Sequence, residues 1–314
     1  MTVVTNTTRI AVIGAGHVGA TSAYALMLRA LVSEIVLIDT NEALAEAEAA
    51  DIADANALAR PTRVWAGTYA DAATARIAVL TAGAATHGSE SRLSVLSRSA
   101  EIVGACVQSL IDAGFTGTIL VAANPVDIMA HVALRTSGLP ARHVIGTGTL
   151  LDSSRLRQAL AAKLDVAPES LAGFVLGEHG DSEVVAFSTV RIGGLTLDDF
   201  VPIGEHLDHD IIARDVREAG YRIISGKGHT SFGIATAVVR ICEAIIRNER
   251  AILPVSTLLT GEFGIADVFL SLPCVLGEGG IERILLPDIS AEEQDALHRS
   301  AEVIRQVMST LETA

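Results

Sequence analysis

The sequence predicts an α/β protein in two parts, a doubly wound parallel sheet followed by an α+β domain. In the first half, short apolar runs alternate with helical patterns, which is typical of a parallel sheet covered on both faces. In the second half, strand-like runs group together, which favours an α+β arrangement. Half of the 314 residues are hydrophobic, enough for a large buried core.

The first half alternates expected strands with expected helices. Strands are expected at 9–14, 34–39, 76–83 and 116–124. Helices are expected at 17–31, 41–58 and 94–114. Because the strand candidates are short and apolar and helices separate them, they indicate successive β–α–β units.

The alternation of strands and helices changes after the stretch HVIGTGT, which ends at residue 149. Helices are expected at 150–163, 208–225, 230–247 and from 290 onward. Strand-like runs lie at 251–259, 264–273 and 281–286. We therefore place the domain boundary near residue 146, which gives domains of residues 1–146 and 147–314.

Composition excludes several classes of function. The net charge of −14 and an aromatic content of only 4% argue against nucleic acid and anionic membranes as partners. Three cysteines without close spacing argue against a disulfide framework or a zinc ribbon, and favour a reducing compartment. No secretory signal or membrane span is recognisable, so a cytoplasmic protein is expected.

The stretch GAGHVG places three glycines between a strand and a helix. Gly14 allows a tight turn, Gly16 lets the backbone approach a pyrophosphate, and Gly19 permits close packing of helix on strand. The start of the helix offers unpaired N–H groups and a positive dipole end to the phosphates. This spacing predicts a Rossmann-type dinucleotide site.

Asp39 follows Gly19 by roughly twenty residues, at the end of the second expected strand. A carboxylate there can accept both ribose hydroxyls and repels a 2′-phosphate, so NAD is expected in preference to NADP. The alternative is that Asp39 caps the helix that follows. The cofactor interpretation is favoured because all its parts occur in the required order.

Three further stretches carry side chains suited to acid–base chemistry. LGEHGDSEV places His179 in a glycine-flanked turn, where the imidazole stays accessible. TLLDSSRLR supplies Asp152 and Arg155, which share one face of a helix. NPVDI places Asn124 after a strand, where ligands bind in open α/β sheets.

Each of these residues also has a structural alternative. A lone histidine is more often structural than catalytic, and the chain has nine. Asp152 and Arg155 could form a surface ion pair, which contributes little to stability. Asn124 could cap a helix that begins at Pro125.

Taken together, the motifs resemble those of the L-lactate and malate dehydrogenase family. GAGHVG, a loop ending in ESR, NPVDI, LDSSR and GEHGDS follow the family's order over essentially the whole chain, and GHTSFGIA is similar to its lactate branch. The resemblance implies an NAD-dependent L-2-hydroxy-acid dehydrogenase, most simply an L-lactate dehydrogenase, in the form of a homodimer or homotetramer. The alternatives are a malate dehydrogenase, an enzyme of the hydroxyisocaproate type for branched substrates, or a silent NAD-binding protein.

The resemblance also implies a role for each site residue. His179 donates a proton to the oxygen of the reduced carbonyl, and Asp152 orients and stabilises the imidazolium. Arg155 binds the substrate carboxylate with its planar fork, and Asn124 hydrogen-bonds the reacting oxygen. Further contacts are implied for Thr86 and Thr230 with the substrate, and for His17, Val18, Asn124 and Ile234 with NAD.

The stretch TAGAATHGSESR, residues 81–92, consists mainly of small residues and ends in an arginine. The resemblance implies that this loop closes over the substrate, where Arg92 polarises the carbonyl and helps to exclude water. The resemblance also implies that Thr86 stands at the position that discriminates between substrates. Being short and uncharged, it favours pyruvate and longer 2-oxo acids over oxaloacetate, unless His87 turns inward as a cation.

Two further expectations concern a metal ion and a sugar bisphosphate, neither of which the protein is expected to use. His206 and His209 occur amid carboxylates in EHLDHD, which indicates a solvated helix start, and no metal is expected. In many bacterial lactate dehydrogenases an arginine and a histidine bind fructose 1,6-bisphosphate. Arg157 matches the arginine, but Ala172 stands in place of the histidine, so little or no activation is expected.

Overall fold

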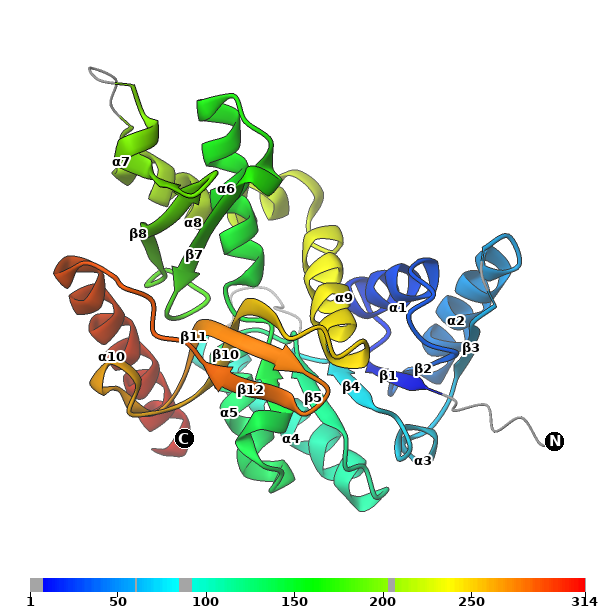
Figure 1. The fold of residues 1–314 in the computed structure, drawn as a ribbon. Helices are drawn as coiled ribbons and strands as arrows, with labels where there is room; N and C mark the ends of the chain where they lie inside the picture. The colour runs from blue at the N-terminus through cyan, green and yellow to red at the C-terminus, as the bar shows by residue number, and fades with distance from the viewer. Residues whose placement is uncertain (1–7, 60, 85–91, 203–206, 314) are drawn as a thin grey trace.

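A nine-stranded sheet forms the centre of the protein (Figure 1). The structure is a computed structural model that describes residues 8–59, 61–84, 92–202 and 207–313. The parallel strands are β1 (Arg9–Ile13), β2 (Glu34–Ile38), β3 (Arg63–Ala66), β4 (Ile77–Leu80), β5 (Thr118–Val121) and β6 (Val144–Gly146). Their order is β3-β2-β1-β4-β5-β6, so the chain reverses direction across the sheet between β1 and β4. Dinucleotides bind at this switch point in doubly wound sheets.

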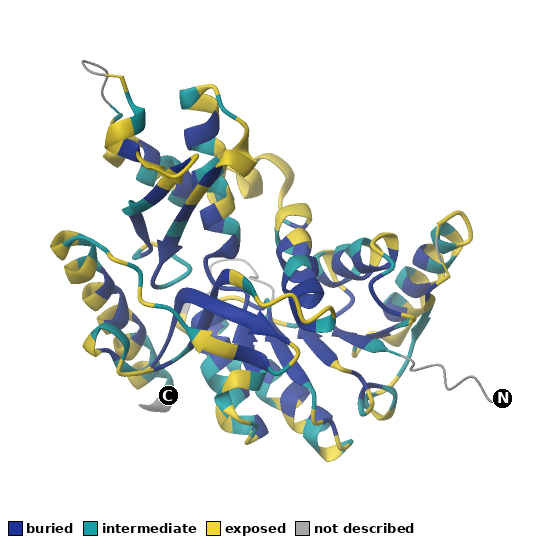
Figure 2. Cartoon of the chain, viewed as in Figure 1, coloured by how far each residue is buried: buried dark blue, intermediate teal, exposed yellow. Residues whose placement is uncertain are grey.

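Helices cover both faces of the parallel strands. One face carries α3 (Tyr69–Ala72), α4 (Arg92–Asp112) and α5 (Val126–Ser137), and α10 (Ala291–Thr313) packs beside α4 and α5. The other carries α1 (His17–Leu28), α2 (Glu42–Asn56) and α9 (Phe232–Ile246). Along β1, Ala11 packs toward the first group and Ile10 toward the second, because side chains alternate along a strand. The strands are therefore apolar throughout, and Figure 2 shows them as the buried centre of the molecule.

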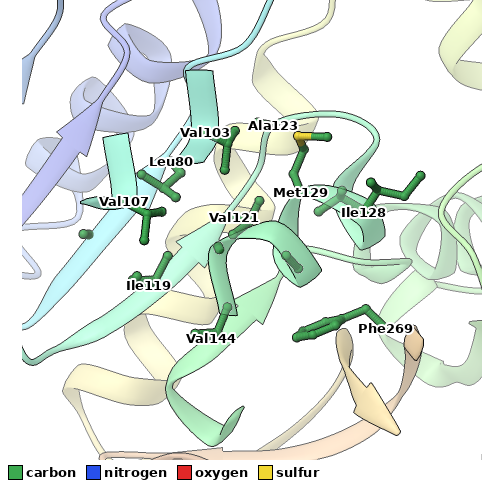
Figure 3. Close-up of a cluster of buried hydrophobic side chains, with 14 of the residues drawn as sticks. Leu80, Val103, Val107, Ile119, Val121, Ala123, Ile128, Met129, Val144 and Phe269 are labelled. Carbon is green, nitrogen blue, oxygen red and sulfur yellow. The ribbon is translucent and has the colours of Figure 1, made fainter. Parts of the chain in front are cut away.

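The two halves of the chain share a hydrophobic core. Leu80 and Ile119 of the parallel strands meet Val103 and Val107 of α4 (Figure 3). Phe269, from the second half, belongs to the same cluster and is fully buried. The nucleotide half is thus stabilised by packing against residues that lie far away in the sequence.

Three strands of the second half extend the central sheet in antiparallel fashion. They are β10 (Ala251–Thr260), β11 (Ala266–Gly277) and β12 (Gly280–Ile284). β10 pairs with β6 through Ser256 and Gly146. Consequently the sheet continues across the boundary expected near residue 146.

A smaller lobe stands above this sheet in Figure 1. It contains the antiparallel strands β7 (Leu171–Leu176), β8 (Val184–Ile192) and β9 (Leu195–Thr196). Its helices are α6 (Leu150–Leu164), α7 (Leu197–Phe200) and α8 (His209–Lys227). It has a core of its own, in which Leu156, Val190 and Ile212 are buried. The predicted α/β class, with a second half that mixes helices and antiparallel strands, is confirmed.

The predicted elements agree with the structure to within a few residues at each end. The first helix ends at Leu28 rather than near residue 31, because Ala30 adopts a positive φ of 47° and leaves the helix. β3 and α3 were not indicated by the sequence, since four residues each are too few for a periodic pattern. No helix within the described ranges is long and apolar enough to cross a membrane.

Candidate active site

A cavity of about 390 Å³ lies at the carboxyl ends of the parallel strands, beneath the smaller lobe. The predicted site residues that line it are Val18, Asn124, Asp152, Arg155, His179, Thr230 and Ile234. They come from α1, α6, α9 and three loops. The fold therefore brings segments together that are widely separated in the sequence.

The three glycines of the loop beside the cavity have two different roles. Gly14 has a φ of 101°, and a Cβ there would lie 2.6 Å from the backbone nitrogen of Ala82. A Cβ on Gly19 would overlap the carbonyl oxygen of Gly14. A Cβ on Gly16, by contrast, would meet nothing within 4 Å. The chain itself requires Gly14 and Gly19, whereas Gly16 borders the open space that a pyrophosphate needs.

The start of α1 is suited to hold an anion. Gly16 is its N-cap residue, so no side chain caps the helix, and its first turn contains no acidic residue. The N–H groups and the positive end of the helix dipole are therefore open to a phosphate. These features fit the pyrophosphate of a dinucleotide.

Asp39 ties the end of β2 to the glycine loop. Its Oδ2 accepts a hydrogen bond from the backbone N–H of Ala15 at 2.7 Å, and its Oδ1 accepts one from Asn41 at 2.8 Å. The N-cap of α2 is Asn41, whose side chain accepts from the N–H of Leu44 at 3.2 Å. The alternative interpretation of Asp39 as the helix cap is therefore wrong. Each carboxylate oxygen keeps a lone pair with which it can accept a ribose hydroxyl.

The acid–base centre is a hydrogen-bonded chain of three side chains. Nδ1 of His179 donates to Oδ2 of Asp152 at 2.6 Å. Oδ1 of Asp152 accepts from the guanidinium of Arg155 at 2.7 Å. Because Asp152 is only 2% exposed, the interpretation of this pair as a surface ion pair is wrong.

The charges around His179 keep its imidazole protonated. Burial lowers the pKa of His179, but the charge and hydrogen bond of Asp152 raise it, as do Asp127 and Glu183, and the resulting pKa is about 9. Burial also raises the pKa of Asp152, but His179 and Arg155 outweigh it and hold this pKa below its ordinary value. At neutral pH the centre is thus an imidazolium beside a carboxylate, which can donate a proton.

Asp127 supports the catalytic loop and was not predicted. Its Oδ2 accepts from the backbone N–H of His179 at 2.8 Å, and its Oδ1 accepts from the hydroxyl of Ser256 at 2.5 Å. Burial raises its pKa to about 6, although these two hydrogen bonds act in the opposite direction. Asp127 lies within the NPVDI stretch, and its partners become visible only once the chain has folded.

The remaining predicted residues lie at the start of α1, just before α5 and around the start of α9. Asn124 is exposed at the cavity, and the N-cap of α5 is Pro125, so the capping role considered for Asn124 is wrong. Thr230 lies just before α9 and Ile234 in its first turn. At the start of α1, the ring of His17 stacks on that of His229, with centroids 4.0 Å apart.

Some predicted residues lie outside the described part of the chain. These are Thr86, His87 and His206, and of Arg92 only the backbone, which begins α4, is described. His209 is the exposed first residue of α8, which agrees with the predicted solvated helix start. Its ring stacks on that of Phe187, with the ring centroids 4.0 Å apart. The closing loop and the substrate discrimination by Thr86 therefore stay predictions.

The strand order, the glycine loop and the adjacent acid–base centre define a dinucleotide-binding protein equipped for proton transfer. The chain belongs to the lactate/malate dehydrogenase family. The family's NAD binding domain matches residues 8–146, and its alpha/beta C-terminal domain matches residues 149–313. The predicted resemblance and the NAD cofactor are thus confirmed.

Relatives and solved structures agree with this assignment. The chain is 40% identical to the L-lactate dehydrogenase of Priestia megaterium over 96% of its own length and 95% of that protein's. It is 41% identical to the L-lactate dehydrogenase of Thermus aquaticus, covering 96% and 99% of the two chains. The structure is similar to that of the minor L-lactate dehydrogenase from Enterococcus mundtii in its ligand-bound form, with a TM-score of 0.94, 38% identity and 98% of both chains covered. It is also similar to MGS-M5, a lactate dehydrogenase from a deep-sea metagenome, with a TM-score of 0.95, 36% identity, and 98% and 99% covered.

Proposed function

We propose that the protein is an NAD-dependent L-lactate dehydrogenase, which transfers a hydride reversibly between NADH and pyruvate or a similar 2-oxo monocarboxylate. The chain of hydrogen bonds through His179, Asp152 and Arg155 carries this proposal. It joins a proton donor to a carboxylate-binding cation on one cavity wall. Family membership supports the class of reaction, and the relatives named L-lactate dehydrogenase support the substrate.

The proposed mechanism assigns one task to each side chain. NADH, when bound, supplies the hydride. Arg155 holds the substrate carboxylate with the N–H groups that Asp152 does not use. His179 donates its Nε2 proton to the oxygen of the reduced carbonyl, while Asp152 stabilises the imidazolium and fixes the ring. Asn124 donates a hydrogen bond to the same oxygen.

Cofactor binding is assigned to the nucleotide side of the cavity. Gly16 and the start of α1 receive the pyrophosphate, and Asp39 accepts the ribose hydroxyls. The other residues assigned to the cofactor are Gly14, His17, Val18, Gly19, Asn124 and Ile234. Residues 1–146 and 147–314 are proposed as the two domains, with most of the cofactor contacts in the first and the proton donor His179 in the second.

The closing loop is proposed to complete the site. Arg92, at the start of α4, polarises the carbonyl, and Thr86 and Thr230 contact the substrate beyond it. A short threonine leaves room beyond the methyl group of pyruvate, which favours 2-oxobutyrate or branched 2-oxo acids as a second substrate class. Ala172, in place of the histidine, likewise supports the prediction that fructose 1,6-bisphosphate activates the enzyme little, although Arg157 matches the arginine.

The assembly is proposed to be a cytoplasmic homodimer or homotetramer. The exposed side chains of Ile211 and Ile223 on α8 support self-association, since both expose apolar surface and neither lines the cavity. Analytical ultracentrifugation of the purified protein measures the assembly directly. A monomer at micromolar concentration contradicts this part of the proposal.

A substrate panel tests the proposed function. Pyruvate, oxaloacetate, 2-oxobutyrate and a branched 2-oxo acid are compared as substrates, with oxidation of NADH followed by its absorbance. We expect pyruvate to be reduced far more efficiently than oxaloacetate. A preference for oxaloacetate indicates a malate dehydrogenase, and NADH binding without turnover of any acid indicates a silent NAD-binding protein.

A further inference from the structure

Two buried polar atoms at the cavity have no hydrogen-bond partner. In the described part of the chain, three buried side-chain atoms lack one, and two of these belong to residues that line this cavity. They are Oε1 of Glu183, which precedes β8, and Nε of Arg217, in the middle of α8. Glu183 is only 5% exposed. A buried carboxyl oxygen without a donor costs free energy, so its presence beside a reaction centre indicates a function.

Glu183 lies against the acid–base centre itself. One carboxylate oxygen each of Glu183 and Asp152 and one ring nitrogen of His179 lie within 4.8 Å of one another. At this distance, in a buried site, the charge on one group changes the proton affinity of the next. The charged groups that face the Glu183–His179 pair are Asp127 from α5, Asp152 and Arg155 from α6, Glu178 and Asp181 from their own loop, and Arg217 from α8.

Building on the proposed function, we propose that Glu183 is a positioning residue that acts on the reaction through His179. Its carboxylate keeps the imidazole protonated as the pH rises, and Arg217 favours the ionised form of that carboxylate. Glu183 touches neither the reacting carbon nor the reacting oxygen in this scheme. Its charge sets the pH at which His179 loses the proton that it donates to the substrate.

The proton affinities of the two groups support this order of events. Burial raises the pKa of Glu183 to about 8, with Asp152 adding to the increase and Arg217 acting against it. The pKa of His179 is about 9, and the negative charge of Glu183 is one of the causes that raise it. As the pH rises, Glu183 therefore loses its proton first, and the charge it gains holds the proton on His179. Reduction of the 2-oxo acid, which consumes that proton, continues at a higher pH than His179 and Asp152 alone permit.

The pH dependence of turnover tests the proposal in Glu183→Gln, which removes the charge and keeps the size of the side chain. The profile of kcat/KM for pyruvate reduction is measured from about pH 6 to about pH 10, and its alkaline midpoint is compared with that of the wild type. We expect the midpoint to move to lower pH by about one unit, because His179 loses a stabilising charge. The midpoint for lactate oxidation, which requires neutral imidazole, should move in the same direction.

Matched variants separate this effect from a structural one. Arg217→Gln should lower the same midpoint, because without the cation Glu183 stays neutral to a higher pH, and Arg217→Lys should restore it. Glu218→Gln removes the same charge from the exposed neighbouring position on α8 and should leave the midpoint in place. If Glu183→Gln does not fold, Arg217→Gln carries the comparison, with Glu183→Asp as the variant that keeps the charge.

An NMR titration of the His179 imidazole in the free protein measures its pKa without turnover. The pKa should be lower in Glu183→Gln than in the wild type and unchanged in Glu218→Gln. Equal pKa values and equal midpoints in the wild type and Glu183→Gln overturn this inference. A wild-type protein that does not reduce pyruvate, but whose His179 responds to Glu183 as expected, contradicts the proposed function alone.

Discussion

The nucleotide side and the acid–base side of the cavity are built from different parts of the polypeptide. The nucleotide side uses backbone groups of one short loop between β1 and α1, fastened by the side chain of Asp39. The acid–base side uses side chains from α5, α6, α8 and the connection from β7 to β8. A backbone site depends on local spacing, whereas a side-chain site depends on how the whole chain folds.

The two sides also differ in their electrostatics. On the nucleotide side, glycines leave room and a helix end supplies partial charge. On the acid–base side, Asp127, Asp152 and Glu183 are almost fully buried around one imidazole, and the pKa of each is shifted. Substitutions on the first side should therefore change binding, and those on the second should change chemistry and its pH dependence.

The largest effect is expected for His179→Asn. The variant loses the proton donor, so kcat for pyruvate reduction should fall by about 10²- to 10⁴-fold. NADH affinity, measured by fluorescence titration, should stay close to that of the wild type because the nucleotide loop is untouched. Near-normal turnover would remove His179 from the mechanism, and loss of NADH binding would contradict the separation of the two sides.

The next largest effect is expected for Arg155→Lys. Lysine keeps the positive charge but loses the planar fork, which here bonds Asp152 and is proposed to bind the substrate as well. We expect kcat/KM for pyruvate to fall by about 10- to 100-fold, mainly through KM, as for the loss of a charge-assisted hydrogen bond. Arg157→Lys is the control on the same helix, since Arg157 donates to the backbone carbonyl of Ser153 instead. Equal losses in both variants would show a general effect on α6.

This difference between the two sides explains what the sequence could predict. The glycine loop, Asp39 and most helices and strands follow from local patterns, because turns and periodic burial depend on neighbouring residues. Asp152, Arg155 and Asn124 were found through motifs, but motifs alone left open a surface ion pair for the first two and a capping role for the third. Only the structure removed these alternatives, through burial, hydrogen bonds and the position of the helix cap.

The residues that were missed share a physical reason. Asp127 and Arg217 occur in ordinary helical stretches, and Glu183 stands among other acidic residues. Nothing in their immediate neighbours distinguishes a buried acid from a solvated one. Their roles depend on contacts between elements distant in the sequence, as does the pairing of β10 with β6 across the expected domain boundary.

A moderate effect is expected for Asp39→Ser, which tests the nucleotide side. The variant removes the charge that repels a 2′-phosphate, so the preference for NADH over NADPH should narrow by about 10-fold or more. NADH affinity should also fall, because the N–H of Ala15 loses its carboxylate partner. Asp51→Ser, on the exposed face of α2, is the control for net charge. An unchanged cofactor preference would contradict the role of Asp39.

The most gradual effect is expected in the pH dependence of stability, and it should come from the acid–base side. The pKa of Glu183 is raised from 4.5 to about 8, and that of His179 from 6.5 to about 9. Between the ordinary and the raised pKa of each group, the folded protein binds more protons than the unfolded chain. The free energy of unfolding should therefore fall as the pH rises from about 5 to about 9. Asp127, raised from 3.8 to about 6, acts in the same direction at the acid end of this window. The lowered pKa of Asp152 acts in the opposite direction, but only below its ordinary value of 3.8.

Thermal unfolding of the apoprotein, followed by circular dichroism across this pH range, measures the effect. The Tm of the wild type should decrease steadily, and Glu183→Gln should flatten the decrease between about pH 5 and pH 8, because glutamine does not ionise. The exposed change Glu218→Gln should leave the slope as it is. A Tm that is constant or rises over this window would mean that the buried acids are charged in the folded protein, and the acid–base side would then be no more sensitive to pH than the nucleotide side.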